Sequence, residues 1–544
     1  MPLTHQKYRP DIDGLRAIAI LSVVAYHAFP GSVTGGFIGV DIFFVISGFL
    51  ISTIILSNLE NDSFSLGDFY IRCVRRIFPA LILVLTACLA FGWYVLLADE
   101  FRQLGKHTAA GAAFVQNFIL NSESGYFDNA AETKPLLHLW SLALEEQFYI
   151  FWPLMLAFVW KRNWGFLKIA FIIVGISFLI NIYLVQKDIS KAFYFPFSRF
   201  WELMAGGVLA YIILHKPQLI AKFKNTQAIF GLILLGFGIV FINRSNVFPG
   251  WWALVPVCGA FLLIAAGENA WINKNILGNK AMVAVGLISY PLYLWHWPLL
   301  VYTRIVAAEG AMPSREMKLL AITLAIFLSW LTYYFIERKI KHNKHVLLVY
   351  GLIAIMILFI IFGTAINKKI VQPRINNIDV QQMVAAANDQ KGFDGLDKVI
   401  IEGQEVYQTK NFKIPYTLFI GDSHTSHYVP RVRALIEKNS MNSVRFLVRH
   451  GCFSIPDNSS NFNKINSGCN NFRTLIKDLS VSKEMKTIII GGFWNCYFLS
   501  SSNNKGYVGE NFGGDVIKSE IAYSNIKLFL QNLNDNKKNV FFPS

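Results

Sequence analysis

The sequence predicts a polytopic α-helical membrane protein of about eleven transmembrane helices, followed by an α/β domain outside the cytoplasm. Two observations support this prediction. Of the 544 residues, 54% are hydrophobic and only 15% are charged, whereas about 25% are charged in an ordinary soluble domain. The apolar residues are also concentrated before Asn367, in stretches long enough to cross a bilayer.

Apolar stretches of about 17 to 25 residues alternate with short charged loops over this first part of the chain. They lie near residues 15–33, 37–57, 77–97, 137–160, 166–185, 196–214, 227–243, 250–267, 281–302, 319–336 and 346–366. We therefore expect a membrane domain at 1–345, one additional transmembrane helix at 346–367, a polar linker at 368–415 and a soluble domain at 416–544.

Lysine and arginine residues are distributed unevenly between the two sides of the expected bundle. With the N-terminus inside, the cytoplasmic segments hold 17 of them and the outer loops before the last span hold 9. Positive residues gather on the cytoplasmic side of membrane proteins, so the C-terminal domain is expected outside the cytoplasm. The start of the chain runs into a span long enough to remain as an anchor, so no cleavable signal peptide is expected.

The net charge of +16 reflects this loop bias rather than a basic block. Residues 1–367 hold 28 basic and 19 acidic groups (+9), and residues 368–544 hold 22 and 15 (+7). Basic runs interleaved with aromatic residues, which nucleic-acid-binding chains often carry, are absent from the sequence. A nucleic-acid partner is therefore not expected.

The C-terminal region has the pattern of an α/β domain. An apolar run at 416–420 ends in Gly421, a helix-like stretch follows near 429–438, and a second buried strand is expected at 486–491. A further strand-like stretch lies at 539–542. These alternating elements predict a sheet covered by helices.

Six cysteines are present, and three of them, Cys452, Cys469 and Cys496, lie in the C-terminal region. An oxidising compartment outside the cytoplasm would allow Cys452 and Cys469 to pair across a Ser/Asn-rich loop. Cys496 then remains as the odd cysteine of this region.

Two titratable residues in the first expected span indicate an internal polar site. Arg16 and His27 are eleven residues apart, so they share one helix face and lie about 16 Å apart along the axis. Charged groups inside a membrane are costly and usually line a functional cavity. The alternative is an arginine that snorkels to the cytoplasmic side and a histidine that is hydrogen-bonded to a neighbouring helix.

Other expected spans carry polar residues as well. Glu145 lies in the fourth span, Arg199 and Glu202 are three apart in the sixth and able to pair, and the ninth holds His296 and Trp297. So many polar groups on separate helices favour one shared internal cavity.

Five ordered blocks resemble the membrane acyltransferase-3 family over about residues 5–340. They are YRPDIDGLR at 8–16 with His27, FIGVDIFFVISGFLI at 37–51, and the segments 69–79, 140–152 and 289–298. The resemblance implies transfer of an acyl group, usually acetyl from acetyl-CoA, to a carbohydrate outside the cytoplasm. The arginine and histidine of that family fall on Arg16 and His27.

The chemistry agrees with this assignment. Acyl transfer to a hydroxyl requires a base or a relay for the acyl group, and histidine titrates in the useful range. We therefore expect His27 to be the general base or acyl relay, with Arg16 as its electrostatic partner. Glu145 is a weaker catalytic candidate.

Three arginines at the cytoplasmic mouth of the third span are candidates for binding the phosphates of coenzyme A, since guanidinium groups suit phosphate oxygens. They are Arg72, Arg75 and Arg76. The alternative is ordinary positive charge of a cytoplasmic loop. Acetyl-CoA is expected as the acyl donor, and neither a bound metal nor a permanently bound cofactor is expected.

The segment LFIGDSH at 418–424 resembles the first block of the SGNH hydrolase and acetyltransferase family. The resemblance implies that Ser423 is a nucleophile, with an oxyanion hole from its own N–H, Gly451 and Asn495. The base of that family is a histidine near the domain's C-terminal end, whereas the last histidine here is His450. We therefore expect a domain that is either truncated or a degenerate module for acceptor binding.

These features together predict a multi-pass O-acetyltransferase of the bacterial inner membrane, with a cytoplasmic N-terminus and a periplasmic C-terminal domain. The expected acceptor is a cell-envelope polysaccharide, first lipopolysaccharide O-antigen, with peptidoglycan or another polysaccharide as the alternative. A membrane transporter or exporter is the alternative of another class, although no internal repeat relates the two halves of the bundle. A non-catalytic membrane scaffold is the third.

Overall fold

The computed structural model describes residues 8–123, 133–162, 164–307, 313–343, 345–374, 392–438, 443–456, 467–492, 494 and 516–542. The chain divides into two compact units, Met1–Ile375 and Asn376–Ser544. The first unit is helical and the second contains a sheet, as the sequence predicts.

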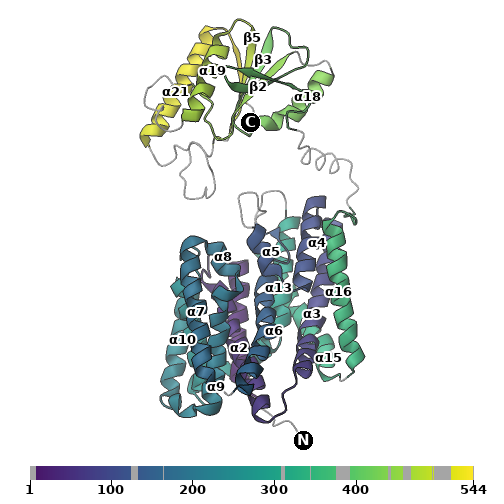
Figure 1. Cartoon of the computed structure of the whole chain (residues 1–544), viewed down its shortest axis with the longest axis vertical. Helices are drawn as coiled ribbons and strands as arrows, with labels where there is room; N and C mark the ends of the chain where they lie inside the picture. The colour runs from purple at the N-terminus through teal and green to yellow at the C-terminus, as the bar shows by residue number, and fades with distance from the viewer. Residues whose placement is uncertain are drawn as a thin grey trace. The chain divides into compact units, whose positions relative to one another are not determined.

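The long helices of the first unit run side by side (Figure 1). Their bounds are α1 Pro10–Ala28, α2 Gly39–Glu60, α3 Leu66–Val95, α4 Ala98–Ala112, α5 Gln116–Glu123, α6 Leu139–Lys161, α7 Phe166–Lys187, α8 Ile189–Tyr194, α9 Pro196–His215, α10 Lys224–Phe241, α11 Leu254–Ala266, α12 Lys280–Leu287, α13 Ser289–Val306, α14 Arg315–Leu331, α15 Arg338–His342 and α16 Val346–Asn367.

Helices occur at all eleven expected span positions, but the expected count of spans is not confirmed. Within the described residues, eight helices are long and apolar enough to cross a membrane, and α12 with α13, bent by 64°, would make a ninth. Helix α11 is shorter, and the first turns of α1 carry Asp11, Asp13 and Arg16. Helix α1 is nonetheless buried along most of its length among the other helices.

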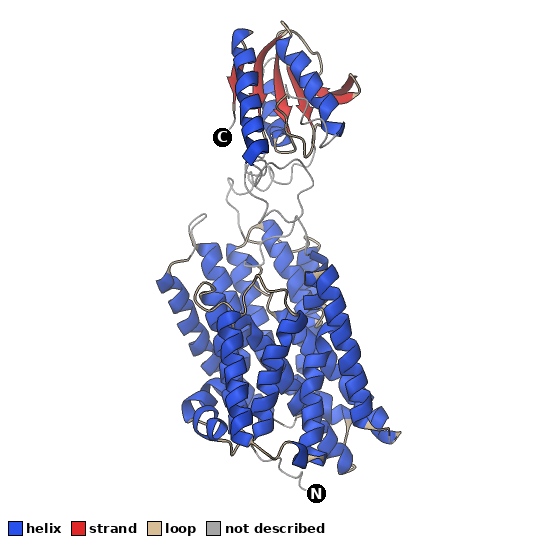
Figure 2. Ribbon diagram, turned by 90° about the vertical axis from the view of Figure 1, so that its left-hand side faces the viewer, coloured by secondary structure: helices blue, strands red, loops and turns tan. Residues whose placement is uncertain are grey.

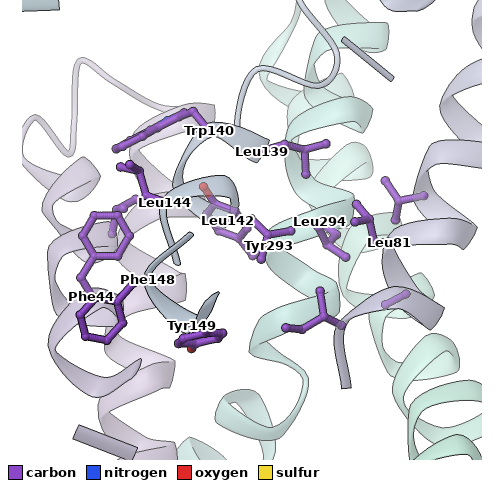
Figure 3. Packing of buried hydrophobic residues seen from close by; sticks show 14 of the residues in the cluster. Phe44, Leu81, Leu139, Trp140, Leu142, Leu144, Phe148, Tyr149, Tyr293 and Leu294 are labelled. Carbon is purple, nitrogen blue, oxygen red and sulfur yellow. The ribbon is translucent and has the colours of Figure 1, made fainter. Parts of the chain in front are cut away.

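Large apolar side chains from α2, α3, α6 and α13 fill the middle of this unit (Figure 3). The fully buried members include Phe44, Leu81, Leu144 and Leu294. Burial of such side chains fixes the relative positions of the helices that carry the polar residues described below.

Helices α2 and α9 approach each other backbone to backbone. A Cβ atom on Gly48 would lie 1.8 Å from the carbonyl oxygen of Leu203, and one on Gly206 would lie 2.1 Å from that of Val45. Small residues permit such close helix packing in membranes. Any larger side chain at these two positions must push the helices apart.

Gly48→Leu is therefore expected to destabilise the protein by about 3 kcal/mol, the upper end of the usual cost of overpacking, because backbone rather than a flexible side chain occupies the space. The thermal midpoint of the protein in detergent measures the effect. Gly175→Leu on α7 is the matched control, since a Cβ atom there meets nothing within 4 Å. Equal midpoints for the two variants would contradict the close approach of α2 and α9.

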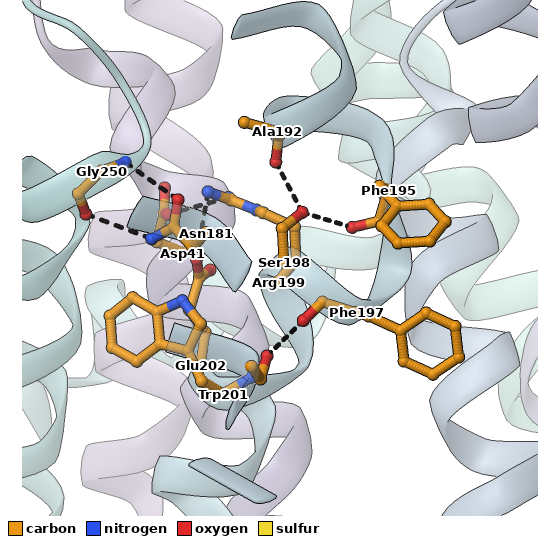
Figure 4. Close-up of polar contacts among 11 residues, drawn as sticks. Asp41, Asn181, Ala192, Phe195, Phe197, Ser198, Arg199, Trp201, Glu202 and Gly250 are labelled. Carbon is orange, nitrogen blue, oxygen red and sulfur yellow. Dashed lines mark hydrogen bonds and ion pairs between the residues drawn. The ribbon is translucent and has the colours of Figure 1, made fainter. Parts of the chain in front are cut away.

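A buried ion-pair cluster also joins α2 and α9 (Figure 4). Arg199 Nη2 lies 2.9 Å from Asp41 Oδ1, and Nη1 lies 3.0 Å from Glu202 Oε1. All three side chains are at most 1% exposed. The expected pair of Arg199 and Glu202 is thereby confirmed, and Asp41 is a partner that the sequence pattern did not indicate.

The second unit has one six-stranded sheet of order β1-β2-β4-β3-β5-β6. Its elements are β1 Asp397–Ile401, β2 Gln404–Gln408, β3 Tyr416–Gly421, α18 Val429–Glu437, β4 Val444–Val448, α19 Ser467–Val481, β5 Met485–Ile490, α21 Val516–Asp535 and β6 Asn539–Phe541. The expected strands at 416–420, 486–491 and 539–542 and the helix near 429–438 are all present.

Strand β3 lies between β4 and β5 and is parallel to both. The chain therefore leaves β3 toward one side of the sheet and returns past it to the other. Right-handed crossovers then place α18 and α19 on opposite faces, and helices cover both faces of the strands in Figure 2. The carboxyl end of β3 is thus a topological switch point, where doubly wound sheets bind ligands.

Part of the expected linker at 368–415 is folded. Strands β1 and β2 form a hairpin that continues the sheet, because β2 pairs with β4. Its two-residue turn is Glu402 and Gly403, with φ of 48° and 75°, the positive values that a type I′ turn requires. The sheet domain therefore begins before residue 416.

The additional helix expected at 346–367 is α16, and it belongs to the helical unit. A Cβ atom on Gly363 would lie 2.5 Å from the carbonyl oxygen of Gly105 on α4. After α16, the carbonyl of Gln372 accepts a hydrogen bond from Trp93 Nε1 on α3. These contacts hold the end of the unit at the α3 and α4 side of the bundle.

The predicted disulfide between Cys452 and Cys469 is present, with the two Cα atoms 5.7 Å apart. It connects the segment after β4 to α19. Cys496 lies outside the described residues. A disulfide at this position is consistent with an oxidising compartment.

Candidate active site

Two histidines from distant parts of the sequence meet inside the helical unit. His27 lies in the last turn of α1, and His296 lies within α13. Nδ1 of His27 is 2.9 Å from Nε2 of His296, and the two ring planes are nearly parallel, with centroids 5.2 Å apart and an interplanar angle of 11°. This contact joins residues that are 269 apart in sequence.

The hydrogen bonds determine the tautomers of a neutral pair. Nδ1 of His296 lies 3.0 Å from the carbonyl oxygen of Leu292, which can only accept, so this nitrogen carries the proton. Nε2 of His296 is then an acceptor, and His27 donates its Nδ1–H to it. The unused lone pair of the two histidines is consequently on Nε2 of His27. A histidine that acts as a base or nucleophile does so through such a lone pair.

Neighbouring side chains hold the two rings in place. The Trp297 ring packs edge-on against His27 at 4.6 Å, and its Nε1 donates to the carbonyl oxygen of Lys134 at 2.9 Å. The hydroxyl of Tyr293 donates to the carbonyl oxygen of His138 at 2.8 Å. The His138 ring lies 6.0 Å from that of His296, so a third histidine borders the pair.

His27 forms part of the wall of a cavity of about 780 Å³. Residues of α1, α2, α6 and α13 line it, together with connecting residues such as Gly31, Asn246 and Pro313. These connections lie at the end of the bundle opposite the start of α1. A volume of this size falls within the range of about 300–1,000 Å³ that is typical of ligand pockets.

A second, smaller cavity of about 60 Å³ lies nearer the start of α1 and is lined by Arg16, Arg76 and Glu145. Val40 and Tyr293 line both cavities. The two cavities are therefore neighbours within the unit, and they share Val40 and Tyr293 as wall residues.

The expected partnership of Arg16 with His27 is not what the structure shows. Arg16 Nη1 lies 3.1 Å from Asp13 Oδ1, one turn earlier on the same helix. Glu145 accepts hydrogen bonds from Ser47 at 3.0 Å and from Tyr149 at 3.3 Å. Both residues lie on α1 and line neighbouring cavities, but the rise along the helix separates Arg16 from the ring that His296 contacts.

The three candidate arginines are near the start of α3, and only Arg76 lines the small cavity. Arg72 and Arg76 are exposed, and Arg75 is half-buried. The structure thus brings Arg76 together with Arg16 and Glu145, while Arg72 lies one turn away on the same helix.

A charged cluster supports the wall that holds Trp297. Glu123 contacts Lys106 at 2.7 Å, and His107 and Lys134 at 2.9 Å each. Burial alone would raise the pKa of Glu123, but the hydrogen bonds from these three side chains outweigh it and hold that pKa well below its ordinary value. Lys134 is only 1% exposed, and its carbonyl is the acceptor for Trp297.

Glu123→Gln is expected to destabilise the protein by at least about 2 kcal/mol at pH 7, because several charged hydrogen bonds are weakened. A carboxylate with a depressed folded-state pKa stabilises the fold above its unfolded pKa of about 4.3 and loses this contribution as the pH falls further. The gap in thermal midpoint between wild type and variant should therefore shrink below about pH 4.

Asp99→Asn is the matched control for this variant, because Asp99 and Arg102 form an exposed pair at 3.9 Å that is worth about 0–1 kcal/mol. If the difference in thermal midpoint between wild type and Glu123→Gln stayed constant from about pH 3 to about pH 7, the assignment of an ionised Glu123 would be contradicted.

In the second unit, Ser423 follows β3 at the switch point of the sheet. The backbone N–H of His424 donates to Asp422 Oδ1 at 2.8 Å. The hydroxyl of Ser426 donates to the carbonyl oxygen of Ser423. Gly451 follows β4, the neighbouring strand, and has a φ of 70°. The sheet thus brings Ser423 and Gly451 to the same edge, whereas Asn495 lies outside the described residues.

His424 is the histidine nearest to Ser423 in sequence, and its Nδ1 lies 3.4 Å from Asp422 Oδ1. Its ring is 5.4 Å from that of His427. Both follow the serine within one turn, a placement that differs from the distant histidine of the SGNH family. The role of Ser423 as a nucleophile therefore stays a prediction, and the described residues assign no base to it.

Sequence reasoning did not assign a role to His296, His138 or Tyr293. His296 was visible as a second histidine inside an expected span, and that is the signal that points to it. Its contact with His27 depends on the packing of α1 against α13, which one sequence does not reveal.

Comparison with known proteins gives two family matches. The model of an acyltransferase domain matches residues 9–334, and the model of an SGNH domain, of the kind fused to AT3 domains, matches residues 390–542. The first match covers more than half of the chain. No solved structure matches.

Three curated relatives illustrate the similarity. SAR0937 of Staphylococcus aureus, provisionally named an O-acetyltransferase, is 30% identical over 455 residues, which cover 77% of this chain and 74% of that protein. OatA of Listeria monocytogenes, named a peptidoglycan O-acetyltransferase, is 32% identical over 359 residues, 62% of this chain and 56% of that protein. YrhL of Bacillus subtilis, provisionally named the same, is 32% identical over 358 residues, 62% of this chain and 55% of that protein. The chain thus spans little more than half the length of the last two.

Proposed function

The chain belongs to the acyltransferase family whose domain matches residues 9–334, and from this premise we propose that it is a membrane O-acetyltransferase. In this proposal it moves an acetyl group from acetyl-CoA to a hydroxyl of a cell-envelope glycan outside the cytoplasm. The observation that carries the proposal is the hydrogen-bonded pair of His27 and His296 in the wall of a cavity of about 780 Å³.

His27 is the proposed general base. Its Nε2 takes the proton of the acceptor hydroxyl while the hydroxyl oxygen bonds to the acetyl carbonyl carbon. The carbon–sulfur bond then breaks, and the departing thiolate of coenzyme A receives the proton from His27. His296 accepts the Nδ1–H of His27 and so orients the His27 ring. In this arrangement the acceptor hydroxyl is the nucleophile, His27 is the base and His296 orients the base. An acetyl group carried on Nε2 of His27 is the relay alternative with the same geometry.

Acetyl-CoA is proposed to approach from the end of the unit where α1 begins. Arg72 and Arg76 are exposed there on one face of α3, and guanidinium groups bind phosphate oxygens bidentately. Arg75 and Arg16 add positive charge beside them. The small cavity that Arg16 and Arg76 line shares Val40 and Tyr293 with the His27 cavity. This adjacency supports the proposal that the acetyl end of the donor reaches His27 from that side.

The excess of lysine and arginine in alternate loops supports an N-terminus in the cytoplasm. The His27 cavity and the second unit would then both lie outside, in a bacterial plasma membrane protein. The disulfide between Cys452 and Cys469 is consistent with that compartment.

Peptidoglycan is the acceptor that the names of OatA and YrhL favour. Lipopolysaccharide O-antigen, the acceptor expected from the sequence, remains the second candidate, because a disulfide-bonded outer domain suits an oxidising periplasm. In either case Ser423 would help to deliver the acetyl group from the switch point of its sheet.

The test is acetyl-ester analysis of envelope glycans from a deletion strain complemented with wild type, His27→Ala or Ser423→Ala. Wild type should restore the ester and His27→Ala should not. If Ser423→Ala also restored the ester, the outer domain would be an accessory to acetyl transfer and Ser423 would not be a catalytic residue. An ester pattern that does not change on deletion would contradict the proposed function and favour a transporter or scaffold.

A further inference from the structure

The side chain of His138 is buried in the wall of the His27 cavity without a hydrogen-bond partner. It is 1% exposed, it lines the cavity, and neither Nδ1 nor Nε2 makes a hydrogen bond to a described residue. The carbonyl group of Leu294 interacts with the ring, but it completes no hydrogen bond with either nitrogen. Buried polar groups in proteins are nearly always hydrogen-bonded, so an exception beside a cavity calls for a functional explanation.

The backbone of His138, by contrast, is held firmly. Its carbonyl oxygen accepts a hydrogen bond from the Tyr293 hydroxyl at 2.8 Å, and Ser141 Oγ lies 2.6 Å from that same hydroxyl. The His138 ring is 5.4 Å from the Tyr293 ring and 6.0 Å from the His296 ring. The ring is therefore fixed beside the histidine that orients His27.

His138 is also the N-cap residue of α6, a helix of 23 residues. Leu137, His138 and Trp140 line the cavity, so the N-terminal end of this helix faces it. The aligned peptide dipoles give such an end a partial positive charge, equivalent to about half an elementary charge. Helix N-termini can for this reason stabilise negative charge that develops on a reacting oxygen. The helix end and the unpartnered ring thus favour an anionic oxygen at the same place.

The proposed acetyl transfer creates such an oxygen. When the acceptor hydroxyl oxygen bonds to the acetyl carbonyl carbon, the hydroxyl proton moves to Nε2 of His27 and one electron pair of the C=O bond moves onto the carbonyl oxygen. The Nδ1–H groups of His27 and His296 are already committed to other acceptors. A neutral imidazole carries one N–H in either tautomer, and since neither nitrogen of His138 is bonded, its N–H has no partner.

We propose that His138 is a further catalytic residue, whose N–H donates to the acetyl carbonyl oxygen as negative charge develops on it. The electron pair returns to re-form the C=O bond when the carbon–sulfur bond breaks, and the thiolate leaves with the proton from His27. The positive end of α6 adds to the same stabilisation. This inference rests on the proposed function and adds to it the group that stabilises the reacting oxygen.

The test replaces the reacting oxygen by sulfur, which is a weak hydrogen-bond acceptor. The full chain in nanodiscs is supplied with envelope glycan of the deletion strain and with either acetyl-CoA or dithioacetyl-CoA, in which sulfur replaces the carbonyl oxygen. His138→Phe should lower the initial rate with acetyl-CoA by about 10²–10³-fold, the usual effect of losing an oxyanion donor, but the rate with dithioacetyl-CoA by less than about threefold. A merely structural role would slow transfer from both thioesters equally.

His138→Gln is the conservative variant and should recover part of the acetyl-CoA rate, because its side-chain amide also carries N–H donors. His138→Leu removes both nitrogens as well and gives the same comparison if His138→Phe does not fold. His215→Phe is the matched control, since His215 is not among the residues that line either cavity. Both of its rates should stay within about twofold of wild type.

Equal losses with the two thioesters in His138→Phe would overturn the inference, as would an acetyl-CoA rate within about threefold of wild type. Failure of the proposed function is distinguishable, because wild-type protein would then transfer nothing to the glycan from either thioester, and the inference would fall with it.

Discussion

His27→Ala is expected to lower the rate of acetyl transfer by about 10²–10⁴-fold, the usual effect of losing a positioned general base. The reason is the tautomer arrangement, in which Nε2 of His27 carries the lone pair and His296 accepts the Nδ1 proton. The measurement is the initial rate of ester formation on envelope glycan by the protein in nanodiscs supplied with acetyl-CoA.

His215→Ala is the matched control, because that histidine stacks on Tyr211 and pairs with Glu60 at the end of α9, away from both cavities. Its rate should be within about twofold of wild type, as for a surface change that leaves the fold intact. His296→Gln should show an intermediate loss and an altered pH profile, since His296 acts through His27. A His27→Ala variant that retains a tenth or more of the wild-type rate (~1.4 kcal/mol) would contradict the base assignment.

Arg199→Met is expected to destabilise the protein by about 3–5 kcal/mol, because it leaves two buried carboxyl groups without their shared cation. Asp41 and Glu202 are at most 1% exposed, and they belong to α2 and α9, which approach each other backbone to backbone. Loss of folded protein in size-exclusion chromatography and a lower thermal midpoint are the measurements.

Adding Asp41→Asn to Arg199→Met should recover part of the lost stability, because one unpaired acid is removed. Arg162→Met is the surface control and should change the midpoint little. If Arg199→Met alone kept the wild-type midpoint, the cluster would not hold α2 against α9.

The apolar pattern predicted the positions of the helices well, because a bilayer-length apolar run leaves few other structures available. The predicted number of spans is not confirmed, since α1 carries three charged residues in its first turns. The hairpin of β1 and β2 was missed because its exposed strands lack the apolar run that marks β3 and β5.

The candidate site shows the same limit. His27 was identified from one helix, but its partner lies 269 residues away and is brought there only by packing. Arg16 was paired with His27 because both share a helix face, yet a spacing of eleven residues extends about 16 Å. Local bonding to Asp13 satisfies the arginine instead. Periodicity thus indicates which face a residue occupies, and only tertiary contacts identify its partner.

The most direct test of the central claim is a sided transfer assay in proteoliposomes. Labelled acetyl-CoA is trapped inside, and envelope glycan is supplied only outside. We expect wild-type protein to place labelled ester on the outer glycan and His27→Ala to place none there. Equal labelling by His27→Ala, or no labelling by wild type while acetyl-CoA remains intact inside, would contradict it.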